Sequence, residues 1–169
     1  GWDIPSLAQE KDISPNDIVT THLCKKCFQY QIKPFRGQEQ DCPLCGALKS
    51  QSTVNVQHGV REDQLNEIYN LMDVYCHPFT SGGQEIPIQE AKLSELITLV
   101  TNYSCGTDSC SRESGGVPLE WSEYREAGTQ FIKANTDKHS IFKELDRVFK
   151  MPKKEKEVQG KKSRNFVLE

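Results

Sequence analysis

The sequence lacks any apolar run as long as a membrane span, and no signal peptide precedes its first motif. It also lacks an excess of basic residues, because its net charge is -3 and its isoelectric point is about 5.9. A nucleic-acid-binding domain is usually more basic. We therefore expect no transmembrane segment, no export through a signal peptide and no general electrostatic affinity for DNA or RNA. No internal repeat is visible either.

The composition fits a soluble globular protein. Hydrophobic residues make up 36% of the 169 residues and charged residues 27%, which suits one domain with a modest core and a small appendage. Seven cysteines is an odd number, and four stand at metal-binding spacing, so we expect a reducing, cytoplasmic location and no disulfide framework. The start at Gly1 and the apolar end at 166–169 lead us to expect a piece of a longer protein.

Two C-x-x-C knuckles indicate a metal site. Cys24 and Cys27 form the first, and Cys42 and Cys45 form the second after fourteen intervening residues. Each knuckle turns two thiolates towards one point, so the pair predicts a zinc ribbon with a tetrahedral shell of four sulfurs. Four protein ligands leave no open position, and the zinc is therefore predicted to be structural. The alternatives are four thiols without metal, or a redox C-x-x-C.

The rest of the chain alternates between strand and helix patterns. Alternation with short connections is typical of a parallel sheet that helices cover, which is the α/β class. The loop at 104–120 carries Cys105 and Cys110, which we interpret as free thiols. For the basic run at 153–164 we favour a solvated linker over a membrane or nucleic-acid contact. The predicted strands are 18–21, 52–58, 74–77, 97–101 and 129–134, and the predicted helices centre on 65–72, 88–96 and 141–149.

The stretch from His77 to Ala91 reads as strand, glycine turn and helix. Gly82 and Gly83 let backbone N–H groups approach a ligand closely, and a helix start favours a phosphate. Glu90 would lie on the first turns of that helix. His77 stands at the sheet edge where α/β proteins bind ligands, and we expect it to be packed and hydrogen-bonded. The alternative is an ordinary connection with a solvated glutamate.

The segment from Leu65 to Ala91 resembles the donor-binding half of retaining, family-4-like glycosyltransferases. The likeness extends over roughly 52–150. It implies two Rossmann-like domains that face each other across a cleft, of which the C-terminal one binds a nucleotide sugar. The matching residues, in order, are Met72, Asp73, Pro78, Ser81, Pro87, Glu90 and Ala91.

The resemblance implies roles for individual residues. Glu90 matches the glutamate that holds the ribose hydroxyls, whereas the first glutamate of the motif falls on Gly82, and Glu85 is a candidate replacement for it. The amides of Gly83, Gln84 and Glu85 would stabilise the leaving diphosphate. No catalytic residue is assigned. The implied donor-binding set is Ser81, Gly82, Gly83, Gln84, Glu85 and Glu90.

The resemblance also implies a domain plan. Residues 1–22 and 52–150 would form the Rossmann-like donor-binding domain with helices on both faces of its sheet, 23–51 a zinc-ribbon insertion, and 151–169 a basic tail. The acceptor-binding N-terminal domain and a basic pair that neutralises the diphosphate would precede Gly1. The alternative function is a non-catalytic zinc-ribbon module that binds protein or RNA, although the acidic isoelectric point weighs against RNA.

Overall fold

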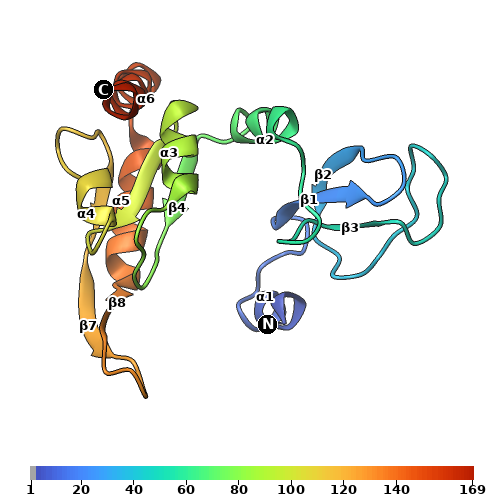
Figure 1. The fold of residues 1–169 in the computed structure, drawn as a ribbon, viewed down its shortest axis with the longest axis horizontal. Coiled ribbons are helices and arrows are strands. Elements are labelled where there is room, and N and C mark those ends of the chain that lie inside the picture. Colours follow the sequence, from blue (N-terminus) through green and yellow to red (C-terminus); the bar gives the residue numbers. More distant parts are fainter. Residues whose placement is uncertain (1–2) are drawn as a thin grey trace. The chain divides into compact units, whose positions relative to one another are not determined.

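The computed structural model describes residues 3–169, and the chain falls into two units (Figure 1). Gly1–Leu65 forms the first, which we call the cysteine unit, and Asn66–Glu169 forms the second, which we call the sheet unit. The division falls inside helix α2 (Glu62–Tyr69). Every helix in the described part of the chain is too short or too polar to cross a bilayer.

The cysteine unit is built on a small antiparallel sheet. It contains helix α1 (Ile4–Glu10) and strands β1 (Val19–Cys24), β2 (Tyr30–Pro34) and β3 (Gln51–Thr53). The strand order is β2-β1-β3. The side chain of Asp3 caps α1 by accepting a hydrogen bond from the amide of Ser6. Aspartate is among the residues that helices favour at this position.

This sheet corrects the predicted domain plan. We expected the strands at 18–21 and 52–58 to belong to the Rossmann-like sheet, with only 23–51 as an insertion. Instead, β1 pairs with β2 and β3 within the cysteine unit. The physical reason is connectivity, because short loops join neighbouring antiparallel strands, whereas a parallel pair needs a crossover of a dozen or more residues. Both strands are therefore used by the ribbon.

The sheet unit contains three parallel strands in the order β4-β5-β6. Its chain runs from β4 (Val74–His77) through α3 (Ile86–Leu93) to β5 (Ile97–Thr101), and then through α4 (Gly106–Ser109) to β6 (Val117–Leu119). All residues of β5 are buried, as the continuous β-branched and apolar run of a central parallel strand predicts.

Strand β6 lies in the stretch that was predicted to be a loop. The loop was predicted because the stretch is polar and rich in glycine, and Pro118 within it cannot donate a ladder hydrogen bond. The structure places Pro118 opposite Val100 on an edge strand, where one side of the ladder has no partner strand. An edge position is where a sheet tolerates proline, and this explains why the prediction was wrong.

Helices cover both faces of the parallel strands (Figure 1). On one face Ile97 and Leu99 pack against Val148 of α5 (Lys138–Lys150). On the other face Val100 packs with Ile88 of α3. The alternation follows from the two-residue period of a strand, which sends successive side chains to opposite faces. The predicted α/β class with a parallel, helix-covered sheet is confirmed to this extent.

An antiparallel hairpin of β7 (Trp121–Arg125) and β8 (Ile132–Thr136) stands beside the parallel strands. The predicted late strand at 129–134 was therefore displaced by about half its length. Two contacts fasten the hairpin to the loops at the carboxyl ends of β4 and β5. The amide of Ala134 donates to the carbonyl of Thr80 at 2.8 Å, and the hydroxyls of Thr101 and Thr136 lie 2.7 Å apart.

Residues 153–168 are not a solvated tail, which corrects a further prediction. They form helix α6 (Lys153–Leu168), which packs against α3. Gly160 makes this approach possible, because a Cβ there would lie 2.2 Å from the carbonyl oxygen of Glu95. The side chain of Gln159 donates to the carbonyl of Gly115 at 2.8 Å. The charged sequence did not predict this helix. Its contacts are made by small residues and backbone carbonyls, so the sequence has no apolar stripe that would indicate it.

A buried lysine lies beneath α6. Lys92 is 1% exposed, and its Nζ donates to the carbonyl of Ser114 at 2.6 Å and lies 5.5 Å from the ring centre of Phe166. Burial lowers the pKa of Lys92 to about 8. The sequence held a signal that was not used, because Lys92 stands four residues after Ile88 and therefore on the buried side of α3.

Candidate functional site

Four cysteine sulfurs meet in the cysteine unit. The Sγ atoms of Cys24, Cys27, Cys42 and Cys45 all lie within 4.8 Å of one another, and the pairs 24–45 and 27–42 are each 3.8 Å apart. A tetrahedral zinc with bonds of about 2.3 Å requires sulfurs about 3.8 Å apart. Disulfide sulfurs would be about 2 Å apart, and all four cysteines are free. The geometry is therefore that of a tetrahedral metal shell.

The two knuckles have matching backbone turns. The amide of Phe28 donates to the carbonyl of Cys24 at 3.1 Å, and the amide of Gly46 donates to the carbonyl of Cys42 at 2.9 Å. In both knuckles the residue after the second cysteine is left-handed, with φ of 57° at Phe28 and 71° at Gly46. Phenylalanine adopts this conformation at a cost, whereas glycine does not. The same turn formed twice is what brings all four sulfurs to one point.

Cys24 is the most completely enclosed of the four ligands. It is 0% exposed, and the amides of Lys26 and Cys27 donate to its sulfur at 3.3 and 3.5 Å. The hydroxyl of Ser50 lies 3.3 Å from the sulfur and lowers the pKa of Cys24 to about 5. A thiolate is the form that binds metal. The four sulfurs therefore fit a metal ion that prefers soft ligands, and they leave it no open position.

The predicted donor-binding residues gather on and after the loop that joins β4 to α3. Ser81, Gly83 and Gln84 are exposed, whereas Gly82 and Glu85 are half-buried. The hydroxyl of Ser104, which follows β5, donates to the carbonyl of Gly82 at 2.7 Å. The loops after the two neighbouring strands are thus joined at the carboxyl edge of the sheet, which is where open α/β sheets bind ligands.

Glu90 lies on α3 and already has a partner in this structure. The hydroxyl of Tyr69 donates to its Oε2 at 3.1 Å. Burial, and then the neighbouring Glu90, raise the pKa of Tyr69. The phenol therefore stays protonated and fixes one carboxylate oxygen, while the other keeps its capacity to accept hydrogen bonds.

A chain of polar contacts that the sequence did not predict leads to Glu85. The hydroxyl of Tyr75 lies 3.1 Å from Nδ1 of His77, and Nε2 of His77 lies 3.3 Å from Oε2 of Glu85. A neutral imidazole with its proton on Nε2 satisfies both contacts. The His77 ring also stacks on Tyr75, with ring centres 5.5 Å apart. The expected packed, hydrogen-bonded role of His77 is confirmed. Its contact with Glu85 was not predicted.

The two glycines of the turn differ in their surroundings. A Cβ on Gly82 would lie 2.2 Å from Oε1 of Glu85, so this carboxylate needs the space beside Gly82. A Cβ on Gly83 would meet nothing within 4 Å. Neither residue has a left-handed φ. At 82 a Cβ would displace only the flexible carboxylate of Glu85, and at 83 neither packing nor backbone conformation within this unit requires glycine.

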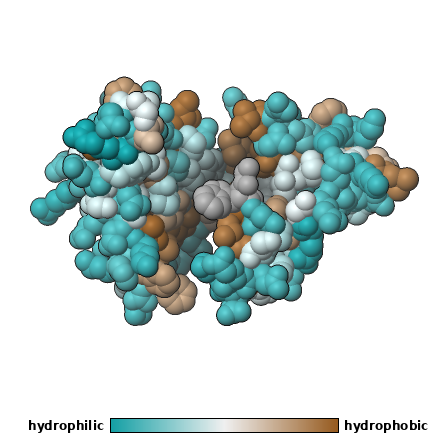
Figure 2. Space-filling model, turned by 90° about the horizontal axis from the view of Figure 1, so that it is seen from below, coloured by the Kyte–Doolittle hydropathy of each residue, from teal (hydrophilic) through white to brown (hydrophobic). Residues whose placement is uncertain are grey.

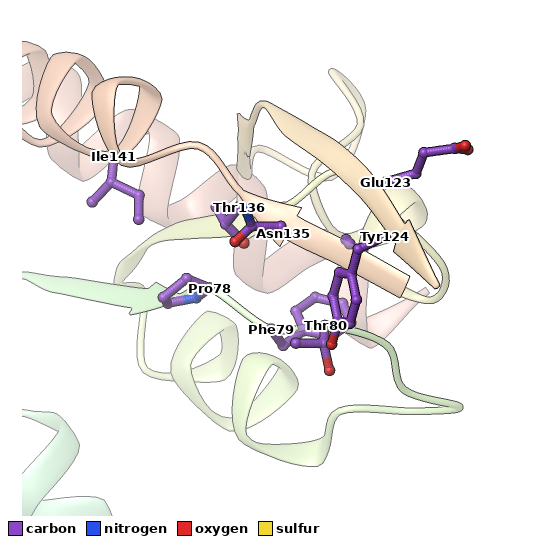
Figure 3. A pocket seen from close by; sticks show the side chains of 9 residues that line it. Pro78, Phe79, Thr80, Glu123, Tyr124, Asn135, Thr136 and Ile141 are labelled. Atoms are coloured by element: carbon purple, nitrogen blue, oxygen red, sulfur yellow. The ribbon is translucent and has the colours of Figure 1, made fainter. Parts of the chain in front are cut away.

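A cavity of about 540 Å³ opens between this loop, the β7–β8 hairpin and the start of α5 (Figure 3). Tyr124 lies beside Phe79 and Thr80, whereas Glu123 points away from them. The lining contains hydroxyl and amide groups and no lysine or arginine, so it suits an uncharged polar group better than a phosphate. No sequence signal marked it, because its walls come from segments far apart in the chain. The lining residues are Pro78, Phe79, Thr80, Glu123, Tyr124, Ala134, Asn135, Thr136 and Ile141.

Comparisons of the chain with protein-family models, with curated proteins and with solved structures give no match.

Proposed function

We propose that the sheet unit is the donor-binding part of a retaining glycosyltransferase that transfers a sugar from a nucleoside diphosphate sugar, and that the four cysteines hold a structural zinc. The observation that carries this proposal is the segment β4, glycine turn and α3, in which Glu85 contacts His77 at the carboxyl end of β4 and Glu90 follows on α3. The sequence resemblance of the same segment points to the same activity.

The turn offers donors for a diphosphate. Among the described residues, none accepts a hydrogen bond from the backbone amides of Gly83 or Gln84. Pro87, in the first turn of α3, has no amide proton and cannot donate a hydrogen bond to an anion. The amides that would bind an anion are therefore those of the residues just before the helix. A ligand that approaches Gly83 closely would explain the glycine there. The amides would then stabilise negative charge as it develops on the leaving diphosphate.

The remaining groups suit the nucleoside and the sugar. Glu90 would accept hydrogen bonds from the ribose hydroxyls with the oxygen that Tyr69 leaves free. Glu85, which His77 holds, would do the same for hydroxyls of the sugar. The bond from the anomeric carbon to the diphosphate would break through an oxocarbenium-like state as the acceptor oxygen bonds to that carbon. The proton of the acceptor hydroxyl would pass to the leaving diphosphate oxygen. The N-terminal domain that the resemblance implies would bind the acceptor. We therefore expect these 169 residues to bind the nucleotide sugar without transferring the sugar.

A nuclear magnetic resonance titration of the isotopically labelled 169-residue chain with UDP, GDP and ADP tests this proposal. We expect one nucleotide to shift the amide resonances of Gly83, Gln84 and neighbouring residues. Glu90→Ala should weaken that binding by about 10- to 100-fold, since a hydrogen bond to a charged group is worth about 1.5–3 kcal/mol. Glu90→Gln should weaken it less.

The matched control is Glu157→Ala, which removes an exposed glutamate from α6. It should leave nucleotide binding unchanged. If no nucleoside diphosphate shifts any resonance between Ser81 and Glu90, the proposal is wrong. If Glu90→Ala binds as tightly as the unaltered chain but melts at a lower temperature, Glu90 serves only the stability of α3.

A second candidate function concerns the cysteine unit. Apolar side chains at and near the knuckles point outward, with Phe28 59%, Leu44 56% and Leu48 78% exposed. A non-catalytic ribbon that binds protein would use such side chains at the centre of its interface. Titration of the chain with single-stranded RNA separates this candidate from an RNA-binding ribbon. RNA binding that depends on Lys25 and Lys26 would indicate an RNA partner. No RNA binding would favour a protein partner.

A further inference from the structure

Helix α5 exposes two phenylalanine rings on its solvent side. Phe142 is 78% and Phe149 81% exposed, while Val148 of the same helix is 0% exposed and packs on the sheet. The two rings are seven residues, or two helical turns, apart, so they lie on the same side of the helix. Leu145, which is 38% exposed, extends this apolar stripe. A lysine follows each ring, namely Lys143 and Lys150.

The stripe lies on a helix with a net positive charge. Helix α5 carries four basic and two acidic residues, whereas residues 1–137 contain eleven basic and nineteen acidic residues. The lysine side chains beside the rings are 73% exposed for Lys143 and 70% for Lys150. The two acidic residues of α5 are paired, because Asp146 lies 2.7 Å from Lys150 and Glu144 lies 2.7 Å from Arg147, so Lys138 and Lys143 supply the net positive charge of the helix. Hydrophilic residues predominate in the view of Figure 2, with several separate hydrophobic patches among them.

We infer that α5 is a membrane-surface contact, and that Phe142 and Phe149 insert at the headgroup level of a bilayer that contains anionic lipid. Exposed aromatic rings on one side of a helix, with lysines beside them, are the features of helices that lie in the membrane interface. Aromatic rings favour that depth, lysine stems reach past apolar surface to anionic headgroups, and each basic residue near such a surface adds attraction. This inference does not depend on the proposed transferase activity.

A second copy of the chain fits this face less well. Two aromatic rings contribute about 150–250 Å² each when buried, whereas a stable interface buries about 800 Å² on each partner. Two copies would also bring two basic segments together, which repel each other. A nucleic acid would match the charge of this face. Its bases would have to stack on two rings that stand on the convex surface of a helix, so this surface suits a nucleic acid less well than a bilayer. An anionic bilayer matches both the charge and the apolar stripe.

Sedimentation of the 169-residue chain with lipid vesicles tests the inference. We expect binding to vesicles of phosphatidylcholine with phosphatidylserine, at least about tenfold weaker binding to phosphatidylcholine alone, and loss of binding as salt rises. Phe142→Ser with Phe149→Ser should weaken binding at least about tenfold, because burial of each ring is the main apolar gain. Lys143→Gln should weaken binding to the anionic vesicles about fivefold.

Phe131→Ser is the matched control, since Phe131 is 66% exposed but lies between β7 and β8. It should leave vesicle binding unchanged, and circular dichroism should show all variants folded because every altered side chain is exposed. The inference is overturned if the chain binds neither vesicle at low salt, or if the double phenylalanine variant binds as well as the unaltered chain. It is also overturned if that variant abolishes a dimer or RNA binding while vesicle binding is absent.

Discussion

The cysteine unit and the sheet unit solve the problem of forming a core in different ways. Among residues 3–65 of the cysteine unit, the buried apolar residues are Ala8, Leu23, Cys24 and Cys42, so half of them are cysteines of the four-sulfur cluster. The sheet unit buries two layers of apolar side chains, one on each face of β4-β5-β6. A unit of this small size rarely reaches stability through its core alone.

This difference indicates where the free energy of folding comes from in each unit. The four sulfurs bring the two knuckles together, so we expect metal binding and folding to be one process there. The sheet unit instead gains from burying strands such as Ile97–Thr101, whose residues are all buried. We therefore expect perturbations of the metal and of the apolar packing to act on different units.

The largest expected effect is that of Cys42→Ala. It removes one of four ligands, and structural zinc in small domains contributes on the order of 10–16 kcal/mol of apparent binding energy. We expect one zinc per unaltered chain, none in the variant, and rapid proteolysis of the variant between Val19 and Thr53 with the sheet unit left intact. Metal analysis and limited proteolysis check this. Cys76→Ala, at a half-buried cysteine of the sheet unit, is the control and should retain the zinc.

Gly160→Ala should destabilise only the sheet unit. Its new Cβ would lie 2.2 Å from the carbonyl oxygen of Glu95, which is backbone and cannot rotate away, so α6 must move from α3. Overpacking of this kind costs about 1–3 kcal/mol. Gly83→Ala is the matched control, because its Cβ would meet nothing within 4 Å. Chemical denaturation checks both variants, and equal stability of the two would contradict the close packing of α6.

Lys92→Met should stabilise the sheet unit at neutral pH. The pKa of Lys92 is lowered from its ordinary 10.5 to about 8 because the charged form is buried, which disfavours the folded state by about 3 kcal/mol at pH 7. The carbonyl of Ser114 loses its donor in the variant, at a cost of about 1 kcal/mol. We expect a net gain of about 1–2 kcal/mol.

The pH dependence of this gain has a defined sign. Between pH 8 and 10.5 the unfolded chain still binds the proton that folded Lys92 has lost, so the stability of the unaltered chain rises with pH in this range. The Met variant lacks that rise, and the difference between the two should shrink towards pH 10.5. The exposed Lys154→Met is the control. A stability difference that stays constant across this range would show that burial does not lower the pKa of Lys92 in the folded state.

Local patterns in the sequence predicted the structural features that are formed by residues close together in the chain. The knuckle spacing predicted the meeting of four sulfurs, and the alternation of the segment 74–101 predicted β4, α3 and β5. In both cases the residues that make the structure lie close together in the chain, so spacing and period carry the information. The glycine turn likewise lies where the sequence placed it.

Long-range contacts were out of reach of those patterns. Several contacts each depend on which segments meet: the pairing of β1 with β3, the burial of Lys92 under α6, the hydrogen bond from Tyr69 to Glu90, and the contact of His77 with Glu85. Helix α6 shows the reason most clearly, because Gly160 and Ser163 make its contacts, and small residues carry no amphipathic signal.

Hydrogen exchange of the 169-residue chain with zinc and after its removal by a chelator tests the difference between the two units most directly. We expect the amides of β1, β2 and β3 to lose their protection when the metal is removed, while those of β4, β5 and α5 keep theirs. Protection of β1–β3 that survives complete metal removal, or loss of protection in both units together, would contradict the account.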